Sequence, residues 1–340
     1  MISTEVAPEA NTRATSAGVR VGALAERFGL AALLVIMVIV FSIQMPDTFA
    51  TTANWRAIAV SQSVLAVAAL ALMLPLVTGR FDISVGANIG ISSIVTAAAM
   101  SDYDLPLIVA IVLALLVGLT IGLVNGALVA YLGVNSIIAT LGVGIILNGL
   151  VQAYTLGIPV SSRLSPALTG LSADLLLGIP VLFLIMLVIA AATSVLLNHT
   201  TFGRYMVATG ANEVAALLNG MRTQRILLGS FAVGGLLAGG AGVLQVAAQG
   251  NGNPQVGGIP FILPALAAVF LGATALKPGT YNVGGTLLGL FFLGVAVSGL
   301  AILGAQPWVT DVFNGAAVVV AVTLSAQFRR RRTGASKLGT

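Results

Sequence analysis

Uncharged polar side chains within hydrophobic stretches are the main candidates for chemistry in this sequence. Amides and hydroxyls donate and accept hydrogen bonds without carrying charge, which suits the binding of a neutral, hydroxyl-rich solute. The residues that we select as candidates to line a solute path are Asp82, Ser84, Asn88, Asn125 and Asn148. The alternative is that such groups satisfy one another between packed helices, where each contributes under about 1–2 kcal/mol.

Asp82 differs from the other candidates because it can be charged. It directly precedes a hydrophobic segment that begins at Ile83, so its carboxylate is placed to cap the free N–H groups at the start of a helix. Arg80, two residues earlier, is a candidate ion-pair partner. The alternative is a plain turn between two hydrophobic segments.

The sequence lacks the motifs of an enzyme. It has no G-x-x-x-x-G-K-[ST] loop, so it cannot hydrolyse a nucleotide in the manner that this loop supports. It has no Ser/His/Asp arrangement, no H-E-x-x-H motif, no cysteine and a single histidine, His199. We therefore expect no catalytic residue, no metal site and no cofactor bound by this chain.

The longest polar interruption between hydrophobic segments is residues 199–225, and its centre predicts a short helix. Asn212 is a suitable N-cap, and Gly220 is suited to the positive φ that often follows a helix end. The apolar residues between these two caps and just beyond share one helical face: Val214, Leu217, Leu218 and Met221. Such a face needs an apolar groove in this chain, at the lipid surface or in a partner.

Composition sets the fold class. Of 340 residues, 58% are hydrophobic and only 7% are charged, whereas a soluble domain is about 25% charged. We therefore expect an all-α, polytopic membrane protein. A span needs about 17–25 residues, and this length predicts about ten helices: 28–45, 57–79, 83–101, two within 105–162, 175–198, two within 226–276, 282–304 and one ending at residue 328.

The positive charges predict the orientation. Ten spans put both termini on one side, together with thirteen of the fifteen lysines and arginines. This excess of positive charge assigns that side to the cytoplasm. The basic residues therefore indicate orientation in the membrane and not nucleic-acid binding. It divides the chain into an N-terminal cytoplasmic tail, 1–27, a transmembrane domain, 28–328, with a cytoplasmic loop at 199–225, and a basic C-terminal tail, 329–340.

Two features qualify this topology. Eight spans would result if a weak pair of segments, such as the second and third, were re-entrant. In addition, residues 122–149 resemble residues 289–315 in their glycines and small residues. The two copies would run in opposite directions across the membrane, as the inverted repeats of transporters do.

Several motifs together resemble the ribose-type ABC importer permeases. Residues 77–86, VTGRFDISVG, are similar to the TGGIDLSVG signature of that family, with Arg80-Phe81 in place of Gly-Ile. The other matching segments follow in the family order: GLVNG at 122–126, IATLG at 138–142, FGR at 202–204, GANEVAALLNG at 210–220, AAVFLGAT at 267–274 and GGT at 284–286. Residues 262–264 and 277–279 also depart from the family pattern, which has an acidic stretch and a glycine-rich turn there.

The resemblance implies a homodimeric permease in a bacterial inner membrane. A separate ATPase, which binds ATP and Mg²⁺, would dock on the cytoplasmic face, and a periplasmic binding protein would deliver a neutral solute such as a monosaccharide. The loop residues that would couple to the ATPase are Gly203, Arg204, Gly210, Asn212, Glu213, Val214, Ala215, Ala216, Leu217, Leu218, Gly220 and Met221.

Two alternatives of another class are a self-sufficient secondary transporter or channel for a small neutral solute and a structural membrane subunit. Ion-coupled transporters usually carry ionisable residues inside their spans. The expected spans here are almost free of charge, which disfavours the secondary transporter.

The topology makes the first testable prediction. Reporter fusions after Asp174 and after Arg332 should report opposite sides of the membrane, because the fusions are separated by an odd number of expected spans. Paired alkaline phosphatase and fluorescent-protein fusions measure this. The same side for both fusion points would contradict ten spans.

Overall fold

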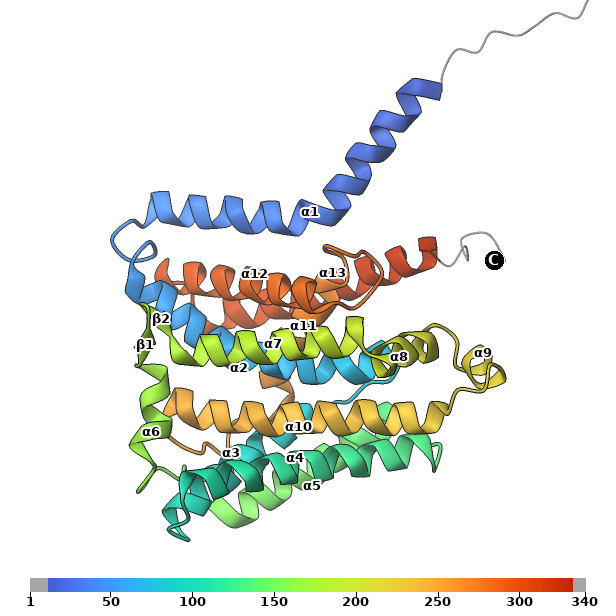
Figure 1. Ribbon diagram of the computed structural model, residues 1–340. Helices are drawn as coiled ribbons and strands as arrows, with labels where there is room; N and C mark the ends of the chain where they lie inside the picture. The colour runs from blue at the N-terminus through green and yellow to red at the C-terminus, as the bar shows by residue number, and fades with distance from the viewer. Residues whose placement is uncertain (1–11, 333–340) are drawn as a thin grey trace, which may run out of the picture.

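The computed structural model describes residues 12–332, which are mostly helical. The long helices lie side by side in one bundle (Figure 1). The elements in chain order are α1 (Thr12–Gln44), α2 (Thr52–Val77), α3 (Val85–Ser101), α4 (Leu107–Ala130), α5 (Ser136–Thr155), α6 (Pro166–Thr169), η1 (Gly170–Ser172), β1 (Leu175–Leu176), β2 (Ile179–Pro180), α7 (Val181–His199), α8 (Thr201–Ala211), α9 (Glu213–Leu218), α10 (Thr223–Gln249), α11 (Ile259–Gly272), α12 (Val283–Ile302) and α13 (Pro307–Arg332).

The expected polytopic fold is confirmed. In the described part of the chain, eight helices are long and apolar enough to cross a membrane, and α3 and α11 are shorter apolar helices. At 1.5 Å per residue, these two extend only about 25 Å and 21 Å, less than the roughly 30 Å of the hydrocarbon core. The short segments are therefore the third and the eighth, whereas the expected weak pair was the second and third.

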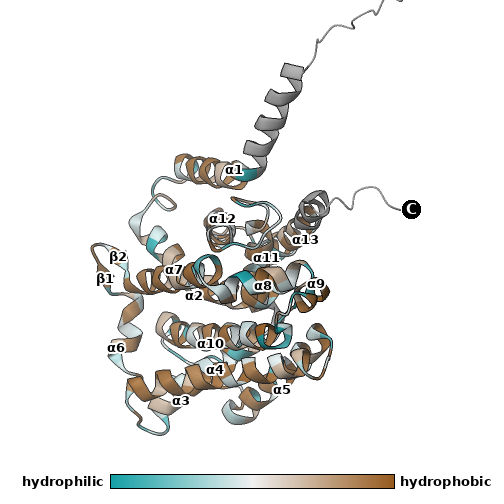
Figure 2. Ribbon diagram, turned by 45° about the vertical axis from the view of Figure 1, so that its right-hand side comes forward, coloured by the Kyte–Doolittle hydropathy of each residue, from teal (hydrophilic) through white to brown (hydrophobic). Residues whose placement is uncertain are grey.

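The outside of the bundle is apolar as well. Figure 2 shows hydrophobic residues along most of the long helices, with hydrophilic residues mainly at the ends and connections. Ile43, Ile108 and Val188 are among many large apolar side chains that are exposed. A water-soluble protein rarely exposes so much contiguous apolar surface, so this surface is suited to contact with lipid.

Several helix ends differ from the sequence-based boundaries. The first helix begins at Thr12, inside the expected tail, and the last continues to Arg332, beyond the expected end at Phe328. Alanine, leucine and arginine are good helix formers, which explains both extensions. The remaining parts of the expected tails, residues 1–11 and 333–340, lie outside the described residues.

The sixth hydrophobic segment also begins later than expected. Leu175 lies in β1, which pairs antiparallel with β2, and α7 starts only at Val181. The two residues between the strands, Leu177 and Gly178, have φ of 56° and 82°. Positive φ at both central residues is the requirement of a type I′ hairpin turn, so a small hairpin replaces the expected first turns of the helix.

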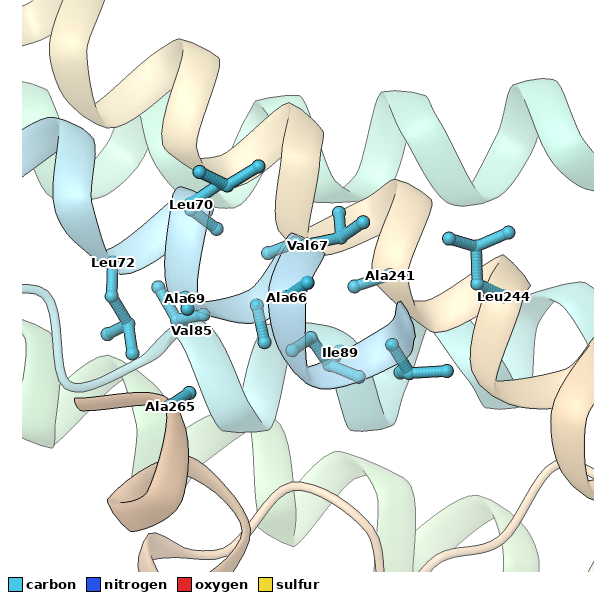
Figure 3. Close-up of a cluster of buried hydrophobic side chains, with 14 of the residues drawn as sticks. Ala66, Val67, Ala69, Leu70, Leu72, Val85, Ile89, Ala241, Leu244 and Ala265 are labelled. Carbon is cyan, nitrogen blue, oxygen red and sulfur yellow. The ribbon is translucent and has the colours of Figure 1, made fainter. Parts of the chain in front are cut away.

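Helix α2 lies at the centre of the core. Its apolar residues occur on all sides of the helix, a pattern typical of a helix that is buried all round. Figure 3 shows side chains of α2 beside labelled side chains of α3, α10 and α11. Leu70 of α2, Ile89 of α3 and Ala265 of α11 are fully buried there.

Helices α4 and α10 cross at very short range. Gly118 and Gly122 of α4 face Gly235 and Gly239 of α10, and a Cβ atom on Gly118 or Gly235 would overlap the other's carbonyl group. Small residues spaced four apart allow helix backbones to approach this closely in membranes. The glycine pair of α10 therefore serves packing.

The helices fall into two sets in which the second member is the shortest. Helices α2 to α5 have 26, 17, 24 and 20 residues, and α10 to α13 have 27, 14, 20 and 26. The first helices of the two sets are exchanged, since α10 packs on α3 and α4 while α2 packs on α11 and α12. Helices α2 and α10 run in opposite directions (Figure 1). The segments expected to repeat, 122–149 and 289–315, fall on equivalent helices of the two sets.

Candidate functional site

Two short helices, α8 and α9, lie together at the end of the bundle opposite the β1–β2 hairpin (Figure 1). Only α9 was predicted; the segment that forms α8 contains Gly203 and Gly210, which are weak helix formers. The Thr200 hydroxyl accepts a hydrogen bond from the Gly203 amide at 3.1 Å and starts α8. The predicted caps of α9 are confirmed: Asn212 Oδ1 accepts from Ala215 N at 2.9 Å, and Gly220 has φ of +78°.

The apolar face of α9 divides into an exposed part and a buried part. Val214, Leu217 and Leu218 are 67%, 60% and 83% exposed. Met221, which was expected on the same face, instead packs against the hydrophobic core of this chain. The helix ends at Leu218, so Met221 follows a turn and no longer shares the helical periodicity. We call the three exposed residues the α9 knob.

The remaining loop residues have varied surroundings. Gly203 packs against the end of α7, where a Cβ atom would overlap the carbonyls of Leu196 and Leu197. Gly210 packs equally closely against the Val77 carbonyl at the end of α2. The residues around them differ in burial: Ala216 is buried, Ala215 is half-buried and Arg204 is exposed. The glycines therefore fix α8 against the membrane helices, while α9 extends beyond them.

Glu213 connects α9 to another part of the chain. Its Oε2 lies 2.6 Å from Nη2 of Arg80, in the link between α2 and α3, and both side chains are more than one third exposed. The expectation that Arg80 pairs with Asp82 was therefore wrong. The pair lines a groove of about 800 Å³ that also contains Arg222 and Arg225. Sequence reasoning missed this pair because its members are 133 positions apart.

Asp82 is buried beside the start of α3. Its Oδ1 accepts hydrogen bonds from the Ser84 amide at 3.0 Å and from the Ser84 hydroxyl at 2.6 Å. The Ser84 hydroxyl in turn accepts from Asn125 Nδ2 of α4 at 2.7 Å. Burial raises the pKa of the Asp82 carboxyl to about 6, against the opposing effect of these hydrogen bonds. Asp82 thus bonds to Ser84, the N-cap residue of α3, and not to the free N–H groups of its first turn; α3 starts at Val85 without a side-chain cap hydrogen bond, so the predicted cap does not form.

Asn88 lies further along α3, at the crossing of α4 and α10. Its Nδ2 is 3.2 Å from the Gly118 carbonyl and 3.3 Å from the Gly235 carbonyl, so one amide bridges both helices. The four candidates Asp82, Ser84, Asn88 and Asn125 are all buried in this conformation. Their contacts are those of helix-to-helix packing, which was the alternative to a solute path.

Asn148 is separate from these four residues. It lies on an exposed face of α5, next to Gly149, and a Cβ atom added to either Gly149 or Gly142 would meet no other atom within 4 Å. An exposed amide beside apolar residues such as Ile145 and Leu150 is unfavourable in contact with lipid. This face is therefore suited to contact with another protein surface or with a polar path.

A second groove opens at the opposite end of the bundle from α9, between α2, α10 and α11. Its volume is about 660 Å³, and its polar lining includes Ser61, Gln245 and Gln249, with the ring of Phe261 beside them. Gln245 is only 4% exposed, and its amide has no hydrogen-bond partner among the described residues. Gln245 is a polar residue within an expected span, but it was not among the residues selected as candidates for the solute path.

Comparisons with known proteins agree with this arrangement. Residues 54–322 match the family described as "Branched-chain amino acid transport system / permease component". The chain is 34% identical to the ribose import permease protein RbsC of Escherichia coli (strain K12), over 88% of this chain and 93% of that protein. It is 33% identical to RbsC of Bacillus subtilis (strain 168), over 86% and 90%.

A further similar protein is the autoinducer 2 import system permease protein LsrD of Photorhabdus temperata, at 29% identity over 87% of this chain and 89% of that protein. No solved structure matches the chain. The similarity to each of these three permeases thus extends over most of both chains.

Replacing Asp82 should impair transport without preventing membrane insertion. Asp82→Ala removes the acceptor of two hydrogen bonds, and a hydrogen bond to a charged group contributes about 1.5–3 kcal/mol. Asp82→Asn keeps one acceptor oxygen and should retain more activity. Solute uptake and the amount of protein in the membrane are measured together, with the exposed Asp47→Ala as control. If Asp82→Ala takes up solute as fast as the unchanged protein, the prediction is wrong and Asp82 is a plain turn residue.

Proposed function

Because the chain belongs to the family of permease components of branched-chain amino acid transport systems, we propose that it forms the path of an ABC importer for a neutral, hydroxylated solute. Members of this family are transport permeases rather than enzymes. A monosaccharide or a related molecule is the solute class that fits best. Two relatives are named for ribose import, and the described helix interiors offer amides and hydroxyls in place of charges.

The observation that carries this proposal is the α9 knob. Leu217 and Leu218 are held outside the bundle by a capped helix, and no part of the described chain covers them. Since the chain has no phosphate-binding loop of its own, the energy of ATP hydrolysis must arrive through contact with another subunit. An apolar knob on a rigid helix fits a cleft in that ATPase subunit.

The orientation follows from the same assignment. We place α8, α9 and both termini on the cytoplasmic side of a bacterial inner membrane, since thirteen of the fifteen lysines and arginines then lie on that side. The β1–β2 hairpin and the groove lined by Gln245 then face the periplasm. A solute-binding protein that docks there would release its solute directly above this groove.

We further propose that two copies of the chain form the importer. The exposed face of α5 carries Asn148 between apolar residues, with open space at Gly142 and Gly149. Small residues favour close contact between helices in membranes. A second copy seated on this face would remove Asn148 from lipid, and it would leave the amide beside the seam between the two subunits.

The periplasmic groove can be tested through Gln245. Its unpartnered amide is suited to donate to and accept from solute hydroxyls, and a neutral hydrogen bond contributes about 0.5–1.5 kcal/mol. Gln245→Ala should therefore lower the initial uptake rate of the carried sugar by roughly two- to tenfold. Uptake of radiolabelled D-ribose, D-xylose and L-arabinose measures this, with the exposed Gln306→Ala as matched control. Equal rates for Gln245→Ala and the control would exclude the groove.

The α9 knob makes a stronger prediction. Leu217→Asp together with Leu218→Asp puts two charges into an apolar contact, where an unpaired buried charge is costly. The variant should insert and remain dimeric, but it should lose co-purification of the ATPase and stimulation of ATP hydrolysis by the loaded binding protein.

Val207→Asp is the control for this experiment, because Val207 is an exposed apolar residue of α8 outside the knob. Pull-down, mass photometry and ATPase assays give the three readouts. Retention of both ATPase binding and stimulated hydrolysis by the double variant would show that α9 is not the coupling contact.

A further inference from the structure

The Arg80–Glu213 ion pair lies between the helix proposed to contact the ATPase and the membrane helices. Glu213 is the first residue of α9, and Arg80 belongs to the link formed by residues 78–84, between α2 and α3. In the signature that this link resembles, glycine stands at the position of Arg80. A glycine has no side chain that reaches α9, so the ion pair is a feature of this chain rather than of the signature.

The same link is attached on its other side to α5. The Phe81 amide donates to Ser136 Oγ at 3.2 Å, and the Ile83 amide donates to Thr140 Oγ1 at 3.0 Å. Both acceptors lie in the first two turns of α5. Backbone donors allow little adjustment by side-chain rotation, so a displacement of the link changes the position of the start of α5.

The link is attached to α4 and α8 as well. Asp82 and Ser84 reach Asn125 of α4 through a continuous set of hydrogen bonds. Gly79, with φ of +81°, lies against Gly210 of α8, whose backbone atoms are 3.9 Å from the position of a Cβ on Gly79. Residues 78–84 therefore connect the membrane helices at this end to α8 by close backbone contact, and to α9 by the ion pair.

We infer that Arg80 is a positioning residue that holds α9 against the 78–84 link, so that movement of α9 is transmitted to α4 and α5. An exposed ion pair contributes little to folding stability, so its main effect is on the position and mobility of α9. Coupling between distant parts of a protein is carried by contiguous contacts of this kind. The inference rests on the proposed function, which assigns α9 to the ATPase contact.

The first test needs neither solute nor ATPase. The chain has no cysteine, so a spin label on Leu218→Cys reports α9 alone in purified protein reconstituted in nanodiscs. Arg80→Gln and Glu213→Gln should each increase the mobility of this label. The charge exchange Arg80→Glu with Glu213→Arg should restore the original spectrum, whereas each reversed charge alone should not. A label on Val207→Cys of α8 is the control and should be unaffected.

The second test adds the ATPase subunit that co-purifies with the permease. A spin label on Ile137→Cys, at the exposed start of α5, should change its spectrum when ATP and vanadate are added. Arg80→Gln should reduce this change by more than half, and the charge exchange should recover it. Because the exchanged pair keeps the net charge, recovery separates the specific contact from a general electrostatic effect.

The outcomes separate this inference from the proposed function. If the unchanged permease binds no ATPase, the proposed function fails whatever the first test shows. If the unchanged permease responds to ATP and Arg80→Gln responds equally, the transmission role of Arg80 is wrong while the importer stands. The role of Arg80 would also be wrong if the two reversed charges have additive effects on the mobility of the α9 label and the charge exchange does not restore the original spectrum.

Discussion

The close crossing of α4 and α10 is the contact on which the rest of the structure depends. Glycines on both helices bring the backbones together, and the Asn88 amide bridges two of the glycine carbonyls at the crossing. Because lipid supplies no hydrogen bonds, helices in a membrane associate through such close packing and through polar bridges. This crossing ties the first set of membrane helices to α10, which follows α9 in the chain.

Charge is distributed according to the same physical constraint. The described ion pairs lie at the two ends of the bundle: Arg80–Glu213 beside α9, and Arg163–Asp104 at the other end. Between them the enclosed polar groups are mostly amides and hydroxyls that bond to backbone carbonyls or to one another. An uncharged interior lowers the cost of opening a path for a neutral solute, and it offers no fixed charge to an ion.

The two ends of the molecule differ in structure. At one end, a capped six-residue helix presents leucines beyond the bundle and is tied back to the α2–α3 link. At the other end, a groove between α2, α10 and α11 contains a nearly buried amide without a partner among the described residues. Helices α2 and α10 extend between both ends, so a rigid-body shift of either helix would alter both sites together. This geometry suits a permease that is driven from outside its own chain.

The sequence by itself determined the features that depend on neighbouring residues. Hydrophobic length predicted the ten apolar helices, and local hydrogen-bonding chemistry predicted the caps of α9 at Asn212 and Gly220. The tertiary structure decided the features that depend on residues distant in the chain. It paired Arg80 with Glu213 instead of Asp82, turned Met221 into the core and separated Asn148 from the enclosed polar residues. A capping residue or an apolar run acts within a few positions, whereas the partner of a side chain depends on how helices far apart in sequence pack together.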